Sequence, residues 1–260
     1  MDCNKNKQMI GLSGLTVGYG KLLLIEDVNA CFAPSSLVAL IGRNGAGKSS
    51  LLRVIAGLDK PLAGEVDMDG KPLATMTAKE KARTIALVTT SRIRVQSLRC
   101  RDLVAMGRAP FTGWAGSLAK DDWEKVDESI AMVGMQAYAN RSMDTMSDGE
   151  CQRIMIARAL AQDTPVMLLD EPTSFLDLPN RYELCLLLKS IAKSEGKCIM
   201  LSTHELDIAL DIADVVALID SPRLVTGCPQ EIVNSESLQR LFQNASVAFD
   251  PSSGKVRPKH

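Results

Sequence analysis

Residues 37–55 read LVALIGRNGAGKSSLLRVI, which is an apolar run, a glycine-rich turn and the beginning of a helix. Residues 42–49 follow the spacing G-x-x-x-x-G-K-S, which is typical of a loop that holds the phosphates of a nucleotide. Glycines let such a loop turn tightly and bring its N–H groups close to a polyanion. An ordinary strand–turn–helix corner is the alternative interpretation. The residues expected to contact the nucleotide are Gly42, Arg43, Asn44, Gly45, Ala46, Gly47, Lys48, Ser49 and Ser50.

Two side chains of this loop carry chemistry of their own. Lys48 can reach the β- and γ-phosphates as a point charge, which makes it a candidate catalytic residue as well. The hydroxyl of Ser49 can ligate Mg²⁺, and the positive end of the following helix faces the phosphates. The loop therefore predicts a site for a nucleotide and a magnesium ion.

Composition places the chain among ordinary globular proteins. Its 260 residues suffice for one large domain or two small ones, and its formal net charge is −1. This charge gives no general attraction to nucleic acid or to an anionic membrane, and no nucleic-acid partner is expected. No run approaches the ~20 apolar residues that span a bilayer, and the N-terminus resembles no secretory signal. A cytoplasmic location follows, and we expect the seven scattered cysteines to be unpaired.

Apolar segments alternate with helical patterns along the chain, which predicts an α/β fold with a doubly wound parallel sheet. The stretch 92–163 is helix-prone and lacks strand runs, so we expect a helical subdomain inserted into the α/β core. The predicted organisation is one domain over residues 1–245, with its core at 1–91 and 164–245, and a C-terminal tail at 246–260. We expect this tail to be a short strand and then unstructured. The predicted core strands are Ile10–Val17, Leu37–Ile41, Thr84–Val88, Val166–Leu169, Cys198–Ser202 and Val215–Ile219.

Three more side chains are candidates for the same site because each follows a predicted buried strand. Asp170 ends the run Val166–Leu169 and can hold Mg²⁺, directly or through water. Glu171 comes next and can act as the general base on an attacking water. His204 follows the strand Cys198–Ser202 and can bond the γ-phosphate or that water. The alternative for the acidic pair is a strand that ends in a solvated turn.

These motifs, in this order, resemble the ATP-binding subunits of ABC transporters. The resemblance covers residues 10–245 and includes Ser147–Arg153, which is similar to the signature sequence of that family, and the loop Ser174–Asp177. Tyr19 matches the aromatic residue that stacks on adenine. The fold that the resemblance implies is a P-loop NTPase (RecA-like) core with an antiparallel β region and an inserted helical subdomain.

The resemblance also implies how the site is completed. Two copies of the chain dimerise head to tail and enclose ATP and Mg²⁺ between the phosphate loop of one copy and the signature of the other. Ser147 is a good N-cap residue whose hydroxyl would meet the γ-phosphate across the interface, together with Gly149 and Glu150. Asp177 would lie at that interface and connect the two sites.

The stretch Asp102–Trp114 narrows the branch of the family. It resembles ATPases of importers for ferric siderophores, haem and cobalamin, in which this region faces the permease. The alternative is a helix and loop that only pack on their own subdomain. The implied function is the ATP-hydrolysing motor of such an importer. It would act with transmembrane permease subunits, and indirectly with an extracytoplasmic substrate-binding protein, from the inner face of the plasma membrane.

The sequence departs from the family pattern at two positions. Thr90 stands where the family has a glutamine that contacts Mg²⁺ and the attacking water, so Thr90 is the expected metal contact there. Asp148 replaces a signature glycine, and its charge near a γ-phosphate is unfavourable. We expect slower hydrolysis or weaker dimerisation as a result. The arginines at 92, 94, 99 and 101 form either a solvated face or a contact with the permease.

Two other functions remain open at this stage. One is a soluble ABC-type ATPase in a process other than transport, although the second ATPase module, coiled coils or zinc inserts usual in such proteins are not visible in this sequence. The other is a nucleotide switch that scarcely hydrolyses ATP. Thr90 and Asp148 favour this alternative, and it is opposed by the presence of Lys48, Asp170, Glu171 and His204.

Overall fold

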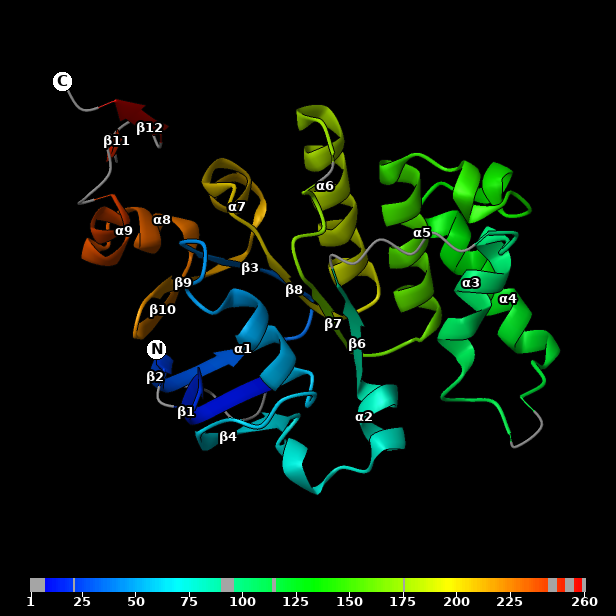
Figure 1. The fold of residues 1–260 in the computed structure, drawn as a ribbon, viewed down its shortest axis with the longest axis horizontal. Helices are drawn as coiled ribbons and strands as arrows, with labels where there is room; N and C mark the ends of the chain where they lie inside the picture. The colour runs from blue at the N-terminus through cyan, green and yellow to red at the C-terminus, as the bar shows by residue number, and fades with distance from the viewer. Residues whose placement is uncertain are drawn as a thin grey trace.

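A computed structural model describes residues 8–20, 22–89, 96–113, 116–174, 176–242, 247–250 and 255–258. Two main sheets, a two-stranded hairpin and several groups of helices make up this part of the chain (Figure 1). Within these ranges, none of the helices combines the length and the apolar character that crossing a membrane requires.

The larger sheet has six strands and carries the residues of the predicted nucleotide site. Five of its strands are parallel, and the edge strand β10 pairs antiparallel with β9. The parallel strands β7 and β8 are buried along their whole length, and β3 is buried except at Gly42, as expected for strands covered on both faces. This arrangement confirms the predicted α/β fold. In spatial order the strands are β10 (Arg223–Gly227), β9 (Val215–Asp220), β3 (Ser36–Gly42), β8 (Cys198–Ser202), β7 (Val166–Leu169) and β6 (Ile85–Val88).

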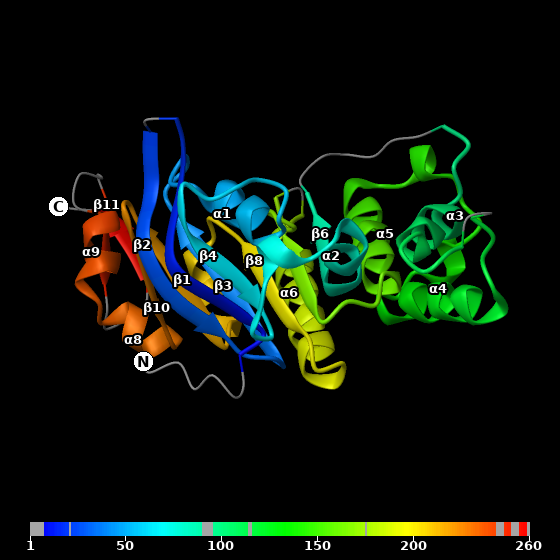
Figure 2. The same ribbon diagram turned by 90° about the horizontal axis from the view of Figure 1, so that it is seen from below.

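The smaller sheet is antiparallel and confirms the predicted antiparallel region. It lies on the side of helix α1 (Lys48–Ile55), as the turned view shows (Figure 2). Its inward side chains and those of α1 share one buried cluster with Val38 and Leu40 of the larger sheet. The alternate residues Ala39 and Ile41 point to the opposite face, as the two-residue period of a strand requires. Its strands are β2 (Leu22–Phe32), β1 (Ile10–Tyr19), β4 (Ala63–Met68) and β5 (Lys71–Pro72).

Helices cover the other face of the larger sheet. Buried side chains of α6 and α7 join the cluster that contains Leu169 and Leu201, and those of α8 and α9 pack with Ile41 and Leu218. The sheet is thus a central layer between the antiparallel strands with α1 on one face and these helices on the other (Figures 1 and 2). The bounds are α6 (Leu178–Ser194), α7 (Leu206–Ile212), α8 (Pro229–Val233) and α9 (Glu236–Leu241).

A group of helices lies at the opposite end of the molecule from α8 and α9, next to β6 (Figures 1 and 2). Its described residues hold helices and a single isolated β-bridge, which agrees with the helix-prone pattern of residues 92–163. The exact domain division stays a prediction. The elements are α3 (Cys100–Ala105), η3 (Met106–Arg108), α4 (Lys120–Met132), η4 (Gln136–Tyr138), η5 (Met143–Thr145) and α5 (Asp148–Ala161), while η2 (Leu73–Thr75) and α2 (Ala78–Thr84) precede β6.

Two expectations from the sequence are wrong. The tail forms a hairpin of β11 (Val247–Asp250) and β12 (Lys255–Pro258), not a strand followed by an unstructured end. Phe249 of this hairpin is buried and stacks on Phe242, with ring centroids 6.2 Å apart, which supplies the apolar contact that anchors it. Cys31 is disulfide-bonded, whereas Cys100, Cys151, Cys185, Cys198 and Cys228 take part in no disulfide, as expected. Sequence spacing missed this bond because spatial approach of the Cβ atoms decides pairing.

Candidate nucleotide site

The loop at residues 42–49 connects the central strand β3 to α1. Gly47 is the N-cap of α1 and has a left-handed backbone with φ 104°, and Gly45 has φ 79°. A Cβ atom at Gly47 would lie 3.1 Å from the Cβ atom of Leu24, so the loop also passes close to strand β2. Glycine is therefore required at residue 47 by both its φ and its close approach to β2. The free N–H groups at the beginning of α1 face the space next to the loop.

A cavity of about 630 Å³ lies beside this loop. It is bounded by the β1–β2 hairpin on one side and by the carboxyl ends of β7 and β8 on the other. Ligands of α/β sheets occupy this position because loops from neighbouring parallel strands meet there. The residues around it are Tyr19, Leu22, Leu24, Asn44, Gly45, Gly47, Lys48, Ser49, Ser50, Glu171 and His204.

Lys48 is the charged residue at the base of the cavity. Only 6% of it is exposed, and its Nζ donates to the carbonyl oxygen of Gly42 at 3.0 Å. Burial lowers the pKa of the Lys48 ammonium, although the charges of Glu171 and Asp170 act in the opposite direction. A phosphate would add negative charge next to this desolvated ammonium, so the side chain is placed to gain from binding a polyanion.

Asp170 lies at the end of β7 and shares its carboxylate with two hydroxyl groups. Ser49 Oγ donates to Asp170 Oδ1 at 3.0 Å, and Ser202 Oγ donates to the same oxygen at 2.7 Å. The hydroxyl of Ser49 and the carboxylate of Asp170 are hard oxygen donors that face each other at the mouth of the loop. This donor set fits Mg²⁺, which binds one or two such protein ligands and takes its other oxygens from phosphate and water.

Glu171 and His204 lie next to each other at the edge of the cavity. Glu171 Oε1 is 3.9 Å from His204 Nδ1, and His204 Nε2 is 3.9 Å from Glu205 Oε1. Half of the His204 side chain is exposed, and Glu171 is also partly open to solvent. A carboxylate and an imidazole therefore both line the cavity beside the phosphate loop, where they can bond a water molecule.

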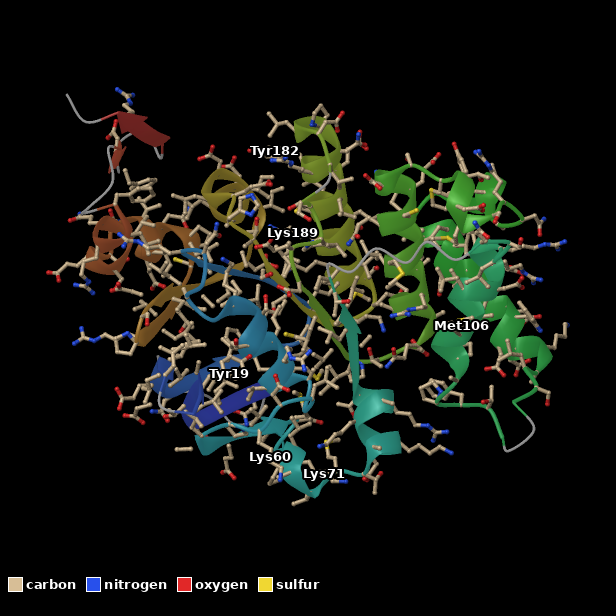
Figure 3. All side chains as sticks on the ribbon, in the orientation of Figure 1. Tyr19, Lys60, Lys71, Met106, Tyr182 and Lys189 are labelled. Atoms are coloured by element: carbon tan, nitrogen blue, oxygen red, sulfur yellow. The ribbon has the colours of Figure 1, made fainter. Side chains whose placement is uncertain are left out.

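Tyr19 lies at the rim of the cavity, beside α1 (Figure 3). Its hydroxyl donates to Ser50 Oγ at 2.9 Å, and the residue is 55% exposed. The ring therefore offers an open aromatic surface. Its stacking on an adenine stays a prediction.

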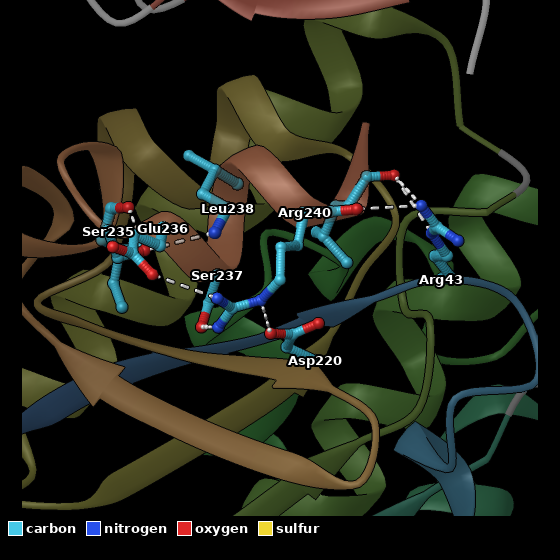
Figure 4. A network of polar contacts seen from close by, with 9 residues as sticks. Arg43, Asp220, Ser235, Glu236, Ser237, Leu238 and Arg240 are labelled. Carbon is cyan, nitrogen blue, oxygen red and sulfur yellow. Dashed lines mark hydrogen bonds and ion pairs between the residues drawn. The ribbon is translucent and has the colours of Figure 1, made fainter. Parts of the chain in front are cut away.

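Arg43 points away from the cavity that holds Lys48. Its Nε donates to the carbonyl oxygen of Leu241 at 3.0 Å and its Nη2 to that of Arg240 at 3.1 Å, at the end of α9 (Figure 4). Arg240 is fixed in turn by Asp220, with Nε and Oδ2 2.8 Å apart. The side chain of Arg43 thus anchors the phosphate loop to α9, and its main chain remains part of the loop.

The signature residues lie at the beginning of α5 and do not line the cavity beside the phosphate loop. Ser147 is the N-cap, with its Oγ accepting from the N–H of Glu150 at 3.3 Å, and the Glu150 carboxylate accepts from the N–H of Ser147 at 2.8 Å. The hydrogen bond from the Ser147 N–H lowers the pKa of Glu150. Ser147, Gly149 and Glu150 line a second cavity of about 290 Å³ with Leu176, and none of these four residues lines the first. Within one copy, the two halves of the predicted site are therefore apart.

The remaining predicted residues are placed as follows. Asp177 is the N-cap of α6, and its carboxylate accepts from the N–H of Asn180 at 3.2 Å. In the chain it directly follows Leu176, which lines the second cavity. Thr90 and two arginines of the basic cluster, at 92 and 94, lie outside the described residues. Sequence reasoning missed Ser202, which contacts both Asp170 and Glu171. Its signal was a polar residue at the end of the otherwise apolar strand β8.

Comparisons with known proteins agree with this geometry. The family model described as "ABC transporter" matches residues 25–174. The ferric enterobactin transport ATP-binding protein FepC of Escherichia coli (strain K12) is 35% identical and covers 92% of this chain and 89% of its own length. The hemin import ATP-binding protein HmuV of Nocardia farcinica is 37% identical, with coverage of 87% and 78%. A solved ATP-binding cassette, a dimer in a post-hydrolysis state with ADP and Pi, has a TM-score of 0.73 at 25% identity and covers 85% and 99%.

Proposed function

Because this chain belongs to the ABC transporter family, we propose that it is the ATP-hydrolysing subunit of an importer for iron chelates, either a ferric siderophore or haem. Cobalamin is the alternative cargo. The observation that carries the proposal is the placement of Lys48, Ser49 and Glu171 around one cavity, with Asp170 bonded to Ser49. A phosphate-binding loop, a metal-binding carboxylate and a second carboxylate are the parts that hydrolysis of a nucleoside triphosphate requires.

In the proposed reaction the protein mainly positions the phosphates of ATP and the attacking water and polarises the bonds that react. The loop N–H groups and Lys48 bind the β- and γ-phosphates and offset the charge that develops on them. The Glu171 carboxylate accepts the proton of the attacking water, and His204, 3.9 Å away, orients that water and the γ-phosphate. Ser49 and Asp170 would hold Mg²⁺, which neutralises phosphate charge when bound.

The separation of the two cavities supports a shared site. Within one copy the signature residues line a cavity apart from that of Lys48, so a second copy has to supply them. We infer a head-to-tail dimer in which Ser147, Gly149 and Glu150 of one copy close over the ATP bound by the other. Asp177, at the N-terminus of α6, would lie at this junction.

The face around η3 is the proposed contact with permease subunits. Met106 is 55% exposed there (Figure 3). Phe111 lies between two guanidinium groups, 4.9 Å from that of Arg83 and 4.0 Å from that of Arg108. An exposed apolar side chain beside a rigid aromatic and two arginines is typical of the anchoring part of an interface. Docking there would place the chain on the inner face of the plasma membrane, with a substrate-binding protein acting from the other side.

Replacement of Glu171 by glutamine tests the proposed chemistry. The amide keeps the size of the side chain but cannot accept the proton, so turnover of ATP should fall by about 10²–10⁴-fold while ATP still binds. Purified wild-type and E171Q proteins would be compared for phosphate release and for binding of a fluorescent ATP analogue. Turnover that survives in E171Q would remove Glu171 from the proposed role.

The cargo needs a separate experiment. The chain would be reconstituted in vesicles with candidate permease subunits and a binding protein of the iron-chelate importer type. ATP-dependent uptake of an iron-labelled siderophore or of haem would support the proposal, with E171Q as the control. Uptake of cobalamin alone, or of none of the three, would contradict the iron-chelate assignment.

A further inference from the structure

Ser202 is a buried hydroxyl group between the strands that carry the site. It is the last residue of β8, where it is paired with Leu40 of β3, and it is 0% exposed. The neighbouring residue Leu201 is paired with Leu169 of β7. Ser202 therefore lies between the strand that leads into the phosphate loop and the strand that ends at Asp170.

Both hydrogen-bonding functions of this hydroxyl are used by the two acidic residues. Ser202 Oγ donates to Asp170 Oδ1 at 2.7 Å and accepts from the N–H of Glu171 at 2.8 Å. One buried atom thus bonds the side chain of the metal-binding carboxylate and the main chain of the general base. Because a buried N–H without a partner is unfavourable, these bonds fix the turn between β7 and the loop that follows.

The backbone of Glu171 gives this contact a specific purpose. Glu171 has φ 46°, in the left-handed region that residues other than glycine rarely adopt. Such a conformation persists only where its surroundings impose it. The hydrogen bond from the Glu171 N–H to Ser202 Oγ holds the peptide group between Asp170 and Glu171, next to the unusual φ angle. The same hydroxyl group also fixes the carboxylate of Asp170.

We propose that Ser202 is a positioning residue that sets the direction of the Glu171 carboxylate relative to Asp170. This rests on the proposed roles of Asp170 and Glu171. Removal of the hydroxyl lets Glu171 relax toward an ordinary φ and swings its carboxylate away from the attacking water. The loop N–H groups and Lys48 are unchanged, so ATP binding stays while the chemical step slows.

Serine-to-alanine variants at two buried positions test this proposal. S202A should lower kcat by about 10–100-fold, as expected for a displaced catalytic group, with KM for ATP little changed. S129A is the matched control because Ser129 is 1% exposed and bonds only to Lys125 within α4, far from the site. Equal kcat values for S202A and the wild type, with S129A unchanged, would overturn the proposal.

Two further measurements separate positioning from a general loss of stability. Deuterium exchange of the nucleotide-free protein should be faster at the Glu171 amide in S202A than in S129A, while the amides of α1 keep their protection. In the E171Q background, S202A should lower kcat by a much smaller factor than it does in the wild type. Both changes act through the Glu171 carboxylate, so their effects do not add. The proposal would be overturned if the Glu171 amide exchanged at the same rate in S202A and S129A. It would also be overturned if S202A lowered kcat by the same factor in E171Q as in the wild type.

The same set of variants distinguishes this inference from the proposed function. If D170N and E171Q keep wild-type turnover, the proposed roles of the two carboxylates fail. If D170N and E171Q lose turnover but S202A does not, those roles stand and only the role of Ser202 fails.

Discussion

Asp148 stands where the family resemblance predicts a glycine. It is the first residue of α5, directly after the N-cap Ser147. A carboxylate there stabilises the helix by about 0.3–1 kcal/mol but repels a γ-phosphate brought to the same helix end. We expect D148G to raise ATP turnover several-fold and to lower the free energy of unfolding slightly.

Steady-state phosphate release and urea unfolding of the same preparations would measure both effects. D148N is the matched control because it removes the charge and keeps a side chain. A turnover in D148G that equals or falls below that of the wild type would show that the aspartate does not limit the reaction.

The acidic and basic side chains of the candidate site could be proposed from the sequence because their spacing is fixed within short segments. Lys48 and Ser49 belong to one loop, and Asp170 and Glu171 follow one strand, so local pattern placed them. Ser202 was missed because its importance arises from strand order, which puts β8 beside both β3 and β7. The anchoring of Arg43 on α9 was missed for the same reason, since no local pattern connects the two segments.

At the scale of elements, Asp214 fastens β3 to the helix layer. Its carboxylate accepts from the N–H of Leu37 at 2.9 Å and is paired with Lys193 at 3.2 Å and Lys189 at 3.5 Å. Burial alone would raise the pKa of Asp214, but the Leu37 bond and the two lysines outweigh it, and the pKa lies below the ordinary value of an aspartate.

This lowered pKa predicts the sign of a pH dependence. A carboxyl whose pKa is lower in the folded state contributes stability above its unfolded pKa and loses it as the pH falls through the folded value. We expect D214A to cost about 1–3 kcal/mol at pH 7 because the Leu37 N–H is left without a partner. The difference in the free energy of unfolding between wild type and D214A should shrink as the pH falls below the unfolded pKa of an aspartate, about 3.9, toward the lower folded value.

Urea unfolding between pH 7 and pH 3 would measure this difference. E128A, at an exposed position of α4, is the control and should change stability by less than about 0.5 kcal/mol. A D214A difference that stays constant over this range would show that the Asp214 charge does not contribute.

Elements were predicted from sequence where apolar runs are long and buried. The parallel strands were found because their burial on both faces produces unbroken apolar segments such as Val166–Leu169. The second strand of the C-terminal hairpin was missed because β12 reads KVRP, which alternates apolar and basic residues over only four positions, and its pairing with β11 has no local signal. The order of the strands in the sheet could not be predicted from the sequence either, because it depends on contacts between segments far apart in the chain.

At the scale of the whole molecule, the proposed head-to-tail dimer predicts complementation between inactive variants. K48A lacks the phosphate-binding charge and S147A lacks the signature hydroxyl, so each should be inactive alone. In a mixed dimer, one site combines both defects and the other combines two intact halves. We expect an equal mixture to recover about a quarter of wild-type turnover, since half of the dimers are mixed and each has one working site.

The mixture would be assayed for phosphate release after the subunits have exchanged. T77A is the control for S147A because Thr77 caps α2 with Glu80 in the same manner, far from the proposed interface. T77A keeps Lys48 and Ser147, so it should be active alone, and its equal mixture with K48A should give about half of wild-type turnover, since a quarter of the dimers have two complete sites and half have one. Absence of recovery in the K48A and S147A mixture would contradict the shared site.

The anchoring of Arg43 on α9 has a consequence for the biosynthesis of the protein. The carbonyl oxygen that Arg43 binds belongs to a residue 198 positions further along the chain. At roughly 5–20 residues per second, a ribosome needs about 10–40 s to make that partner after it has made the loop. A nascent chain therefore carries its phosphate loop without this anchor for most of its synthesis, and the loop reaches its final support only when α9 has emerged and docked.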